Sequence, residues 1–199
     1  MIVGVVLAAG RGHRFGGAKL IQPLRGRPLL SYAVEAALAS RLDRVIVVRP
    51  RSHPEWETVV KSSAERLAYL SNPDPGRGQM SSLKLALGSM AAAVEAAVVL
   101  LADMPLVAPS LIDALLVSFR KDGRSVVPVC DGRWRHPRLL AAELFPEFLA
   151  LDDDAAGGDL LEARRAEIGA LEFSDARQFL DVDRRGDLAH LERILSAES

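Results

Sequence analysis

Residues 2–10, IVGVVLAAG, decide the fold that the sequence predicts. The first six residues are apolar and mostly β-branched, and small residues follow them. A strand that is apolar at every position is typical of a parallel sheet with helices on both faces. The stretch is too short to span a bilayer and no basic region precedes it. We therefore expect a buried strand at the centre of a sheet and no signal peptide.

The rest of the chain alternates between apolar runs and stretches with helical spacing. Strands are expected at 44–48, 67–70, 96–101, 125–129 and 179–182. Helices are expected at 28–40, 54–66, 80–94, 109–120, 139–150, 159–166 and 187–195. Strands that alternate with helices indicate an α/β fold with a mostly parallel, Rossmann-like sheet between two helical layers. We expect one three-layer domain over residues 1–199.

The composition excludes several classes of protein. The 199 residues are 49% hydrophobic and 26% charged, with 25 basic and 26 acidic residues. A net charge of −1 gives no overall attraction to nucleic acid or to an anionic membrane, so neither is an expected partner. The single cysteine, Cys130, cannot form an internal disulfide or a cysteine metal cluster, which predicts a reducing, cytoplasmic location.

The loop after the first strand is rich in glycine and positive charge. Residues 7–19 read LAAGRGHRFGGAK, with four glycines and the cations Arg14 and Lys19. Ligands of open α/β sheets bind beyond the carboxyl ends of the strands. Glycines there let backbone N–H groups point at an anion such as a triphosphate. The spacing of these residues leaves one alternative open, in which the glycines only allow the chain to turn and bind no anion.

Two familiar phosphate motifs do not match this loop. A Walker A loop needs Ser or Thr after its lysine, but Leu20 follows Lys19. A dinucleotide fingerprint needs GxGxxG, and here the third glycine, Gly16, comes one residue late. The longer element through residue 30, LAAGRGHRFGGAKLIQPLRGRPLL, resembles the MobA-like nucleotidyltransferases. It is more distantly similar to the sugar-phosphate nucleotidyltransferases and the methylerythritol-phosphate cytidylyltransferase.

The resemblance implies a nucleotide-diphospho-sugar-transferase type of sheet and a loop that wraps a nucleoside triphosphate. Arg14 and Lys19 would be catalytic, and the nucleotide-binding positions would be Leu7, Ala8, Ala9, Gly10, Arg11 and Gly12. The pair Ala8-Ala9 resembles the molybdenum cofactor cytidylyltransferases, whereas the guanylyltransferase branch has Gly-Gly there. Two methyl groups would narrow the base slot and disfavour a purine.

Acidic residues occur at two further places. Asp103 follows the apolar run 96–101, at the sheet edge where the glycine loop is expected. Mg²⁺ prefers one or two carboxylates together with phosphate oxygens, although a turn or helix-capping aspartate fits this position as well. The resemblance of LADMP to the family's metal-binding strand end favours Asp103 as a catalytic metal ligand.

The second acidic place is the sequence DVDRRGDL at residues 181–188. Asp181 and Asp183 would share one face of a strand because they are two residues apart. This sequence resembles the family's DVDTPEDL element, which implies that Asp183 is the second magnesium ligand. The role of Asp181 stays open, since it could be either a surface charge or a metal ligand. Residues 184–186 depart from the family pattern.

Three more segments carry candidate contacts. Residues 72–83, NPDPGRGQMSSL, resemble the segment that closes over the nucleotide, which implies roles for Gly78, Ser81 and Ser82. An ordinary helix cap is the alternative for one of the serines. Residues 130–140, CDGRWRHPRLL, and 157–164, GGDLLEAR, partly match acceptor-side segments, which implies acceptor contacts by His136 and Asp159.

The expected activity is Mg²⁺-dependent transfer of CMP from CTP to a phosphorylated acceptor, with release of pyrophosphate. The resemblance implies that the acceptor is the molybdopterin cofactor and that a molybdoenzyme receives the product. The nucleotide half would span about 1–107 and the acceptor half about 108–199. Three alternatives stay open: a guanylyltransferase, a sugar- or alcohol-phosphate cytidylyltransferase, and a nucleotide-binding maturation protein without turnover.

Overall fold

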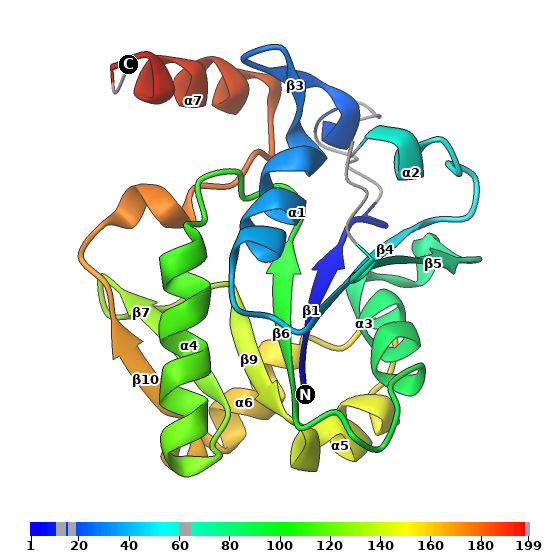
Figure 1. The fold of residues 1–199 in the computed structure, drawn as a ribbon, viewed down its shortest axis with the longest axis vertical. Helices are drawn as coiled ribbons and strands as arrows, with labels where there is room; N and C mark the ends of the chain where they lie inside the picture. Colours follow the sequence, from blue (N-terminus) through cyan, green and yellow to red (C-terminus); the bar gives the residue numbers. More distant parts are fainter. Residues whose placement is uncertain (11–14, 16–18, 60–64, 198–199) are drawn as a thin grey trace.

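The computed structural model describes residues 1–10, 15, 19–59 and 65–197, and it shows a mixed sheet between two layers of helices (Figure 1). The strand order is β10-β7-β9-β6-β1-β4-β5, and β8 pairs with β7. The strands are β1 (Ile2–Leu7), β4 (Arg44–Pro50), β5 (Leu67–Asn72), β6 (Ala96–Leu101), β7 (Val126–Cys130), β8 (Arg133–Trp134), β9 (Arg138–Ala141) and β10 (Gly169–Glu172). A separate small hairpin joins β2 (Pro23–Leu24) to β3 (Arg27–Pro28).

Helices cover both faces of this sheet. One face carries α1 (Leu29–Ala39) and α4 (Pro109–Asp122), and the other carries α3 (Gln79–Gly88), α5 (Phe145–Ala150) and α6 (Gly157–Ala163). The last helix, α7 (Arg185–Ala197), lies beyond the carboxyl ends of β1 and β6 and contacts the hairpin of β2 and β3. The short helix α2 (Trp56–Val59) follows β4. Short 3-10 turns are found at Lys19–Ile21, Pro75–Arg77, Ala142–Leu144, Arg165–Glu167 and Ala176–Phe179.

The central strand β1 is buried on both faces, as its apolar sequence predicts. Ile2 and Val6 pack into the core beneath α1 and α4, whereas Val5 and Leu7 pack into the core beneath α3 and α5. This division follows from the alternation of side chains along a strand. A side chain at position 4 would clash with the core, since a Cβ on Gly4 would lie 2.7 Å from Leu42 Cδ1.

The predicted fold class is confirmed: the fold is α/β and the sheet is mostly parallel. β1 pairs in parallel with β4 and β6, and β4 pairs in parallel with β5. β9 runs antiparallel to both β6 and β7. A helix was expected at 139–150, and the first part of that prediction is wrong. Leu139 and Leu140 are buried in β9, and the helix α5 begins only at Phe145.

Three other expectations differ from the structure. The expected strand at 179–182 is wrong, because a 3-10 turn occupies Ala176–Phe179 and irregular chain follows it. The sheet edge is instead formed by β10, whose residues alternate between half-buried and exposed and give no strong apolar run. The helix expected at 80–94 ends at Gly88. Of the helix expected at 54–66, the structure describes only α2, since residues 60–64 lie outside the described residues.

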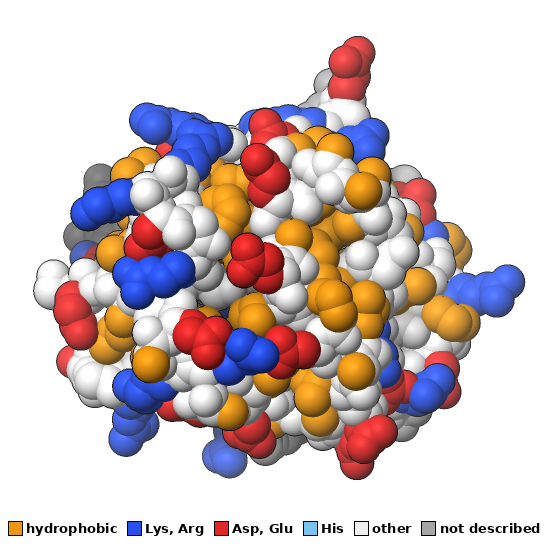
Figure 2. Space-filling view, turned by 90° about the horizontal axis from the view of Figure 1, so that it is seen from below, with side chains coloured by type: hydrophobic (Ala, Val, Ile, Leu, Met, Phe, Trp, Pro, Cys, Tyr) orange, Lys and Arg blue, Asp and Glu red, His pale blue; other side chains and the backbone are white. Residues whose placement is uncertain are grey.

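The end of the molecule shown in Figure 2 mixes apolar, acidic and basic side chains. The described residues on this face form no large area of a single charge, in keeping with the net charge of −1. Among the described helices, none has both the length and the apolar character that crossing a bilayer requires.

Candidate active site

The carboxyl ends of β1 and β6 bring two distant segments together. Leu7 lies opposite Leu101 in the parallel register, and the N–H of Ala102 donates to the carbonyl of Leu7 at 3.3 Å. The chain after β1 and Asp103 after β6 therefore emerge side by side at one edge of the sheet, where ligands of such folds bind.

A small cavity of about 110 Å³ lies at this edge. We call it the nucleotide-side cavity, and its lining residues are Leu7, Ala9, Gly10, Lys19, Leu20, Gln79, Ser82, Leu101, Ala102 and Asp103. Three segments that are far apart in sequence contribute to it: the loop after β1, the start of α3 and the end of β6. Gln79 is a lining residue that sequence reasoning missed.

A charged cluster sits in the wall of this cavity. Lys19 Nζ lies 2.6 Å from Asp103 Oδ2 and 3.9 Å from Asp183 Oδ1. The Lys19 side chain is only 12% exposed and that of Asp103 only 22%, so solvent screens this pair less than it would screen a surface pair. The structure thus brings Lys19 together with two carboxylates, those of Asp103 and Asp183. We call Asp103 and Asp183 the acid pair.

Hydrogen bonds donated by backbone N–H groups, and not a strand, place Asp183 here. The N–H of Val182 donates to the carbonyl of Asp103 at 3.0 Å. The N–H groups of Asp183 and Arg184 both donate to Asp187 Oδ2, at 2.8 and 2.7 Å, which fixes the chain at the start of α7. Burial raises the pKa of Asp181, and the nearby charges of Asp103 and Asp183 raise it further. The three carboxyl groups therefore share one region although they do not share a strand face.

The donor set of this cluster fits a divalent cation. The described residues contain no group of three or more His, Cys, Asp or Glu side chains that could hold a metal alone. Two carboxylates plus phosphate oxygens are the usual ligands of Mg²⁺ at nucleotides. The Lys19 ammonium lies within 4.0 Å of both carboxylates of the acid pair, so this site already holds a positive charge beside them.

The serines at the start of α3 are held by a residue that sequence reasoning missed. Asn72 Nδ2, at the end of β5, donates to Ser82 Oγ at 2.9 Å and to Ser81 Oγ at 3.1 Å. Ser81 Oγ in turn donates to the carbonyl of Gly78 at 2.8 Å. Ser82 lines the nucleotide-side cavity, whereas Ser81 and Gly78 do not. A polar residue that ends a strand before a turn-rich segment was the available signal for Asn72.

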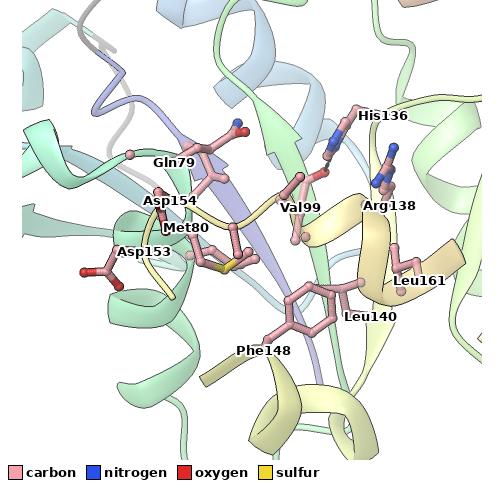
Figure 3. Close-up of a pocket in the computed structure, with 17 residues that line it drawn as sticks. Gln79, Met80, Val99, His136, Arg138, Leu140, Phe148, Asp153, Asp154 and Leu161 are labelled. Carbon is pink, nitrogen blue, oxygen red and sulfur yellow. Dashed lines mark hydrogen bonds between the residues drawn. The ribbon is translucent and has the colours of Figure 1, made fainter. Parts of the chain in front are cut away.

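A larger cavity of about 230 Å³ adjoins the first one beneath α3 and α6 (Figure 3). We call it the acceptor-side cavity, and it shares Leu7 and Gln79 with the nucleotide-side cavity. Its other lining residues are Gly78, Met80, Leu83, Val99, His136, Arg138, Leu140, Phe148, Asp153, Asp154, Ala155, Ala156, Gly157, Gly158 and Leu161. Apolar side chains dominate this wall, as in most small-molecule sites.

His136 lines the acceptor-side cavity, and Asp159 does not. His136 Nδ1 lies 3.4 Å from the carbonyl oxygen of Val99. Burial, with the charge of Arg138 adding to it, lowers the pKa of His136 to about 3, so the ring is neutral near pH 7. Asp159 is exposed, because α6 turns Gly157 and Gly158 toward the cavity and Asp159 away from it. The geometry therefore does not support the expected acceptor contact by Asp159.

Other predicted nucleotide contacts are placed as follows. Ala8 is fully buried in the core beneath α1, and of the two alanines only Ala9 lines the nucleotide-side cavity. Leu7 and Gly10 line that cavity as well. The remaining predicted residues of the loop, Arg11, Gly12 and Arg14, lie outside the described residues.

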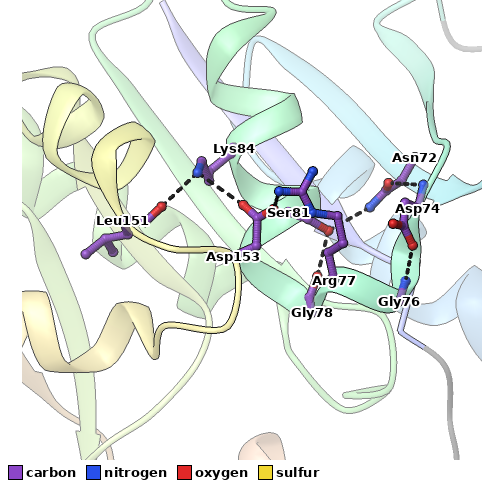
Figure 4. Close-up of polar contacts among 9 residues, drawn as sticks. All are labelled: Asn72, Asp74, Gly76, Arg77, Gly78, Ser81, Lys84, Leu151 and Asp153. Atoms are coloured by element: carbon purple, nitrogen blue, oxygen red, sulfur yellow. Dashed lines mark hydrogen bonds and ion pairs between the residues drawn. The ribbon is translucent and has the colours of Figure 1, made fainter.

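Ion pairs tie α3 and the segment before it to the segment before α6 (Figure 4). Asp153 pairs with Arg77 and also lies 3.1 Å from Lys84 Nζ. Lys84 Nζ donates to the carbonyl of Leu151 at 2.7 Å. The sequence of the acidic run 152–154 does not show which distant cations it meets. These contacts hold the 151–156 loop against the acceptor-side cavity.

Replacing Gly78 by alanine should disturb this arrangement. Gly78 has φ +102°, and a Cβ there would lie 2.7 Å from the carbonyl oxygen of Asp153. We expect Gly78→Ala to lower the free energy of unfolding by about 1–3 kcal/mol and to increase amide exchange at 152–158. Chemical denaturation and hydrogen exchange measure the two effects.

Gly132→Ala is the matched control for that substitution. Gly132 also has a left-handed φ of +70°, but a Cβ there would meet nothing within 4 Å. It should reproduce the backbone cost without the change in exchange at 152–158. Equal exchange in the two variants would contradict the close approach of Gly78 to Asp153.

The geometry defines the class: an α/β domain in which Gly10, Lys19 and the acid pair lie at the carboxyl edge of a parallel sheet, where nucleotide-binding proteins of such folds hold their ligands. Residues 4–168 match the MobA-like NTP transferase domain, and the chain belongs to that family. The chain is therefore a nucleotidyltransferase by family.

Among curated relatives, a probable molybdenum cofactor guanylyltransferase of Thermococcus gammatolerans is 32% identical over 144 residues, which is 69% of this chain and 65% of that protein. Purine catabolism protein PucB of Bacillus subtilis is 29% identical over 204 residues and 98% of both chains. Both guanylyl- and cytidylyltransferases occur among the relatives.

A solved structure from Mycobacterium tuberculosis, Rv0371C in complex with manganese, has the same fold. Its TM-score is 0.78 at 22% identity, over 96% of this chain and 98% of that one. That structure holds a divalent metal, manganese.

Proposed function

We propose that this protein transfers CMP from CTP to the terminal phosphate of a small acceptor and releases pyrophosphate. The observation that carries this proposal is the contact of Lys19 with the acid pair beside two adjoining cavities. The cavities share Leu7 and Gln79, so a nucleotide in one and an acceptor in the other would meet at this wall.

The reaction requires mainly positioning and charge neutralisation. An oxygen of the acceptor phosphate would form a bond to the α-phosphorus of CTP, and the bond from that phosphorus to the bridging oxygen would break. The bonding electrons leave with pyrophosphate. The acceptor phosphate is already ionised near neutral pH, so no general base is needed, and the neutral ring of His136 is free to form hydrogen bonds instead.

The chain's own residues would divide the remaining work. Lys19, together with Arg14, would offset negative charge on the β- and γ-phosphates. Asp103 and Asp183 would hold Mg²⁺, which, when bound, neutralises charge on phosphate oxygens. Ala9, Gly10 and Ser82 would contact the nucleoside, since all three line the nucleotide-side cavity.

For the acceptor we propose the molybdopterin cofactor, with a molybdoenzyme as the protein that receives the product. The resemblance of the Ala8-Ala9 loop to molybdenum cofactor cytidylyltransferases supports this choice. A second candidate is transfer of GMP from GTP, favoured by the relative named as a molybdenum cofactor guanylyltransferase. CTP is preferred here because Ala9, and not glycine, lines the nucleotide-side cavity.

A matrix of nucleoside triphosphates against phosphorylated acceptors, with pyrophosphate as the readout, tests the proposal. We expect the highest kcat/KM for CTP with a molybdopterin acceptor. If kcat/KM were highest for GTP, the result would favour the second candidate, transfer of GMP. No pyrophosphate with any pair would refute turnover and favour a nucleotide-binding maturation protein.

The base preference should respond to Ala9 and not to Ala8. Removing the Ala9 methyl widens the nucleotide-side cavity, and one methyl group is worth roughly 0.8 kcal/mol, so Ala9→Gly should shift kcat/KM toward GTP by about fourfold. Ala8→Gly is the matched control, because Ala8 is buried in the core. It should lower stability by about 1 kcal/mol without changing the preference. Competition between CTP and GTP measures the ratio, and an unchanged ratio in Ala9→Gly would remove the steric argument.

A further inference from the structure

We propose that Arg138 selects the acceptor by binding an anionic group on it, separate from the phosphate that reacts. This inference rests on the proposed function insofar as the acceptor-side cavity takes the acceptor. It adds the chemical class of that acceptor: a small molecule with a second anionic group beyond the reacting one.

Arg138 reaches the acceptor-side cavity because β9 is inserted between β6 and β7. It is the first residue of β9 and lies opposite Val99 of β6 in the antiparallel register. Figure 3 shows its guanidinium at the edge of the cavity on the side of His136 and Leu161, away from Gln79. The strand pairing therefore fixes the backbone that carries this cation.

The guanidinium has donors available for a ligand. Nε donates to the carbonyl of Arg135 at 3.2 Å. Within the described part of the chain, neither Nη1 nor Nη2 of Arg138 has a hydrogen bond or an ion pair. A Cβ on Gly158 would lie 3.2 Å from Nη1, so a side chain at that position would crowd the guanidinium. The two Nη groups thus point into a space that glycine keeps open.

Burial also leaves the charge of Arg138 poorly solvated. Desolvation lowers the pKa of Arg138, and the nearby charge of Glu162 opposes that shift. Glu162 itself is engaged by Arg165, whose Nε donates to it at 2.8 Å. A guanidinium stays protonated at neutral pH whatever its surroundings. A half-buried cation of this kind gains from a carboxylate or phosphate partner.

The other ionisable groups of the acceptor-side cavity do not supply that partner. Asp153 is paired with Arg77 and Lys84 at the far rim. Asp154 is exposed to solvent, and His136 is neutral. The remaining walls are largely apolar, so the ligand has to bring the negative charge. A planar guanidinium binds carboxylates and phosphates through two parallel hydrogen bonds.

The distance from Arg138 to the acid pair separates this contact from the reacting centre. Val99, opposite Arg138, is two residues before the end of β6, and Asp103 is two residues beyond that end. At about 3.3 Å per strand residue, the backbone of Arg138 lies on the order of 10 Å from that of Asp103. Arg138 lines only the acceptor-side cavity and Asp103 only the nucleotide-side cavity. The group that Arg138 binds is therefore distinct from the phosphate that attacks, and apolar atoms of the acceptor would span the interval.

A binding experiment tests the inference without turnover. The probes are phenylphosphonate, a small aromatic dianion, and the neutral benzamide, titrated into the full chain and followed by ligand-observed NMR. Loss of two charge-assisted hydrogen bonds should weaken phenylphosphonate binding by about 10- to 100-fold in Arg138→Gln, with benzamide binding unchanged. Arg138→Lys should retain part of the affinity. Arg133→Gln is the matched control, because it removes the same charge from an exposed position on the neighbouring strand β8.

Steady-state kinetics then separates this inference from the proposed function. With an acceptor found in the matrix, Arg138→Gln should raise the acceptor KM by about 10- to 100-fold and leave kcat and the triphosphate KM within about threefold. Equal phenylphosphonate binding by wild type and Arg138→Gln would overturn the inference, and so would a fall in kcat with an unchanged acceptor KM. If no pair releases pyrophosphate, the proposed function fails, and the NMR titration still decides the role of Arg138.

Discussion

Replacing Asp103 by asparagine is expected to lower kcat at least about 100-fold. The change removes one of the two carboxylates proposed to hold Mg²⁺ and also the 2.6 Å partner of Lys19. The loss of a single electrostatic stabiliser of a transition state costs about 10²- to 10³-fold. Asparagine has the size of aspartate, so the fold should be retained. Pyrophosphate release over a range of Mg²⁺ concentrations measures the effect, and half-saturation should move to higher Mg²⁺.

Asp131→Asn is the control for Asp103→Asn. Asp131 is exposed in the turn between β7 and β8 and has a left-handed φ of 52°, which asparagine also adopts readily. It should leave kcat and the Mg²⁺ dependence unchanged. If Asp103→Asn turned over at a near-normal rate, Asp103 would not be a metal ligand.

Replacing Lys19 by alanine should weaken CTP binding by about 10- to 100-fold and CMP binding much less. The reason is that a charge-assisted contact to the β- and γ-phosphates contributes about 1.5–3 kcal/mol, and CMP lacks those phosphates. Calorimetric titration with CTP and with CMP gives the two losses. Lys121→Ala, which removes an exposed cation near the end of α4, is the matched control.

The same Lys19 variant offers an independent readout on the acid pair. Without the ammonium, the like charges of Asp103 and Asp183 lose a cation that lies within 4.0 Å of both. Added Mg²⁺ should therefore raise the Tm of Lys19→Ala more than that of the wild type. Equal losses for CTP and CMP, or an equal gain in Tm, would place Lys19 away from the phosphates and the metal.

Local sequence signals predicted the parts of the fold with strong periodicity. The apolar runs of β1 and β6 are buried on both faces and adjacent, so the positions of Lys19 and Asp103 at one sheet edge follow from pattern and topology. β10 gave no such signal, because it is a short strand at the edge of the sheet with half-exposed residues. Most residues of β9 were expected to be helical, since a short apolar run has no periodicity that distinguishes a strand from a helix.

For the acid pair, the sequence predicted the right region of the fold but the wrong local structure. Asp181 and Asp183 were expected on a strand, but hydrogen bonds from Val182 to Asp103 and from Asp183 to Asp187 place that segment. Arg138 and Asp153 were not singled out at all. Their importance depends on tertiary contacts, such as the inserted strand β9, that no local pattern encodes.

The wall formed by Leu7 and Gln79 has a consequence for turnover. A dinucleotide product would lie across it and keep the nucleoside contacts and the acceptor contacts, although it would lose those to the β- and γ-phosphates. Tethering would make the second set of contacts effectively intramolecular, which would offset that loss and slow the release of the product. Its escape would then limit the rate of the cycle, and a receiving protein that takes the product directly from this protein would accelerate it.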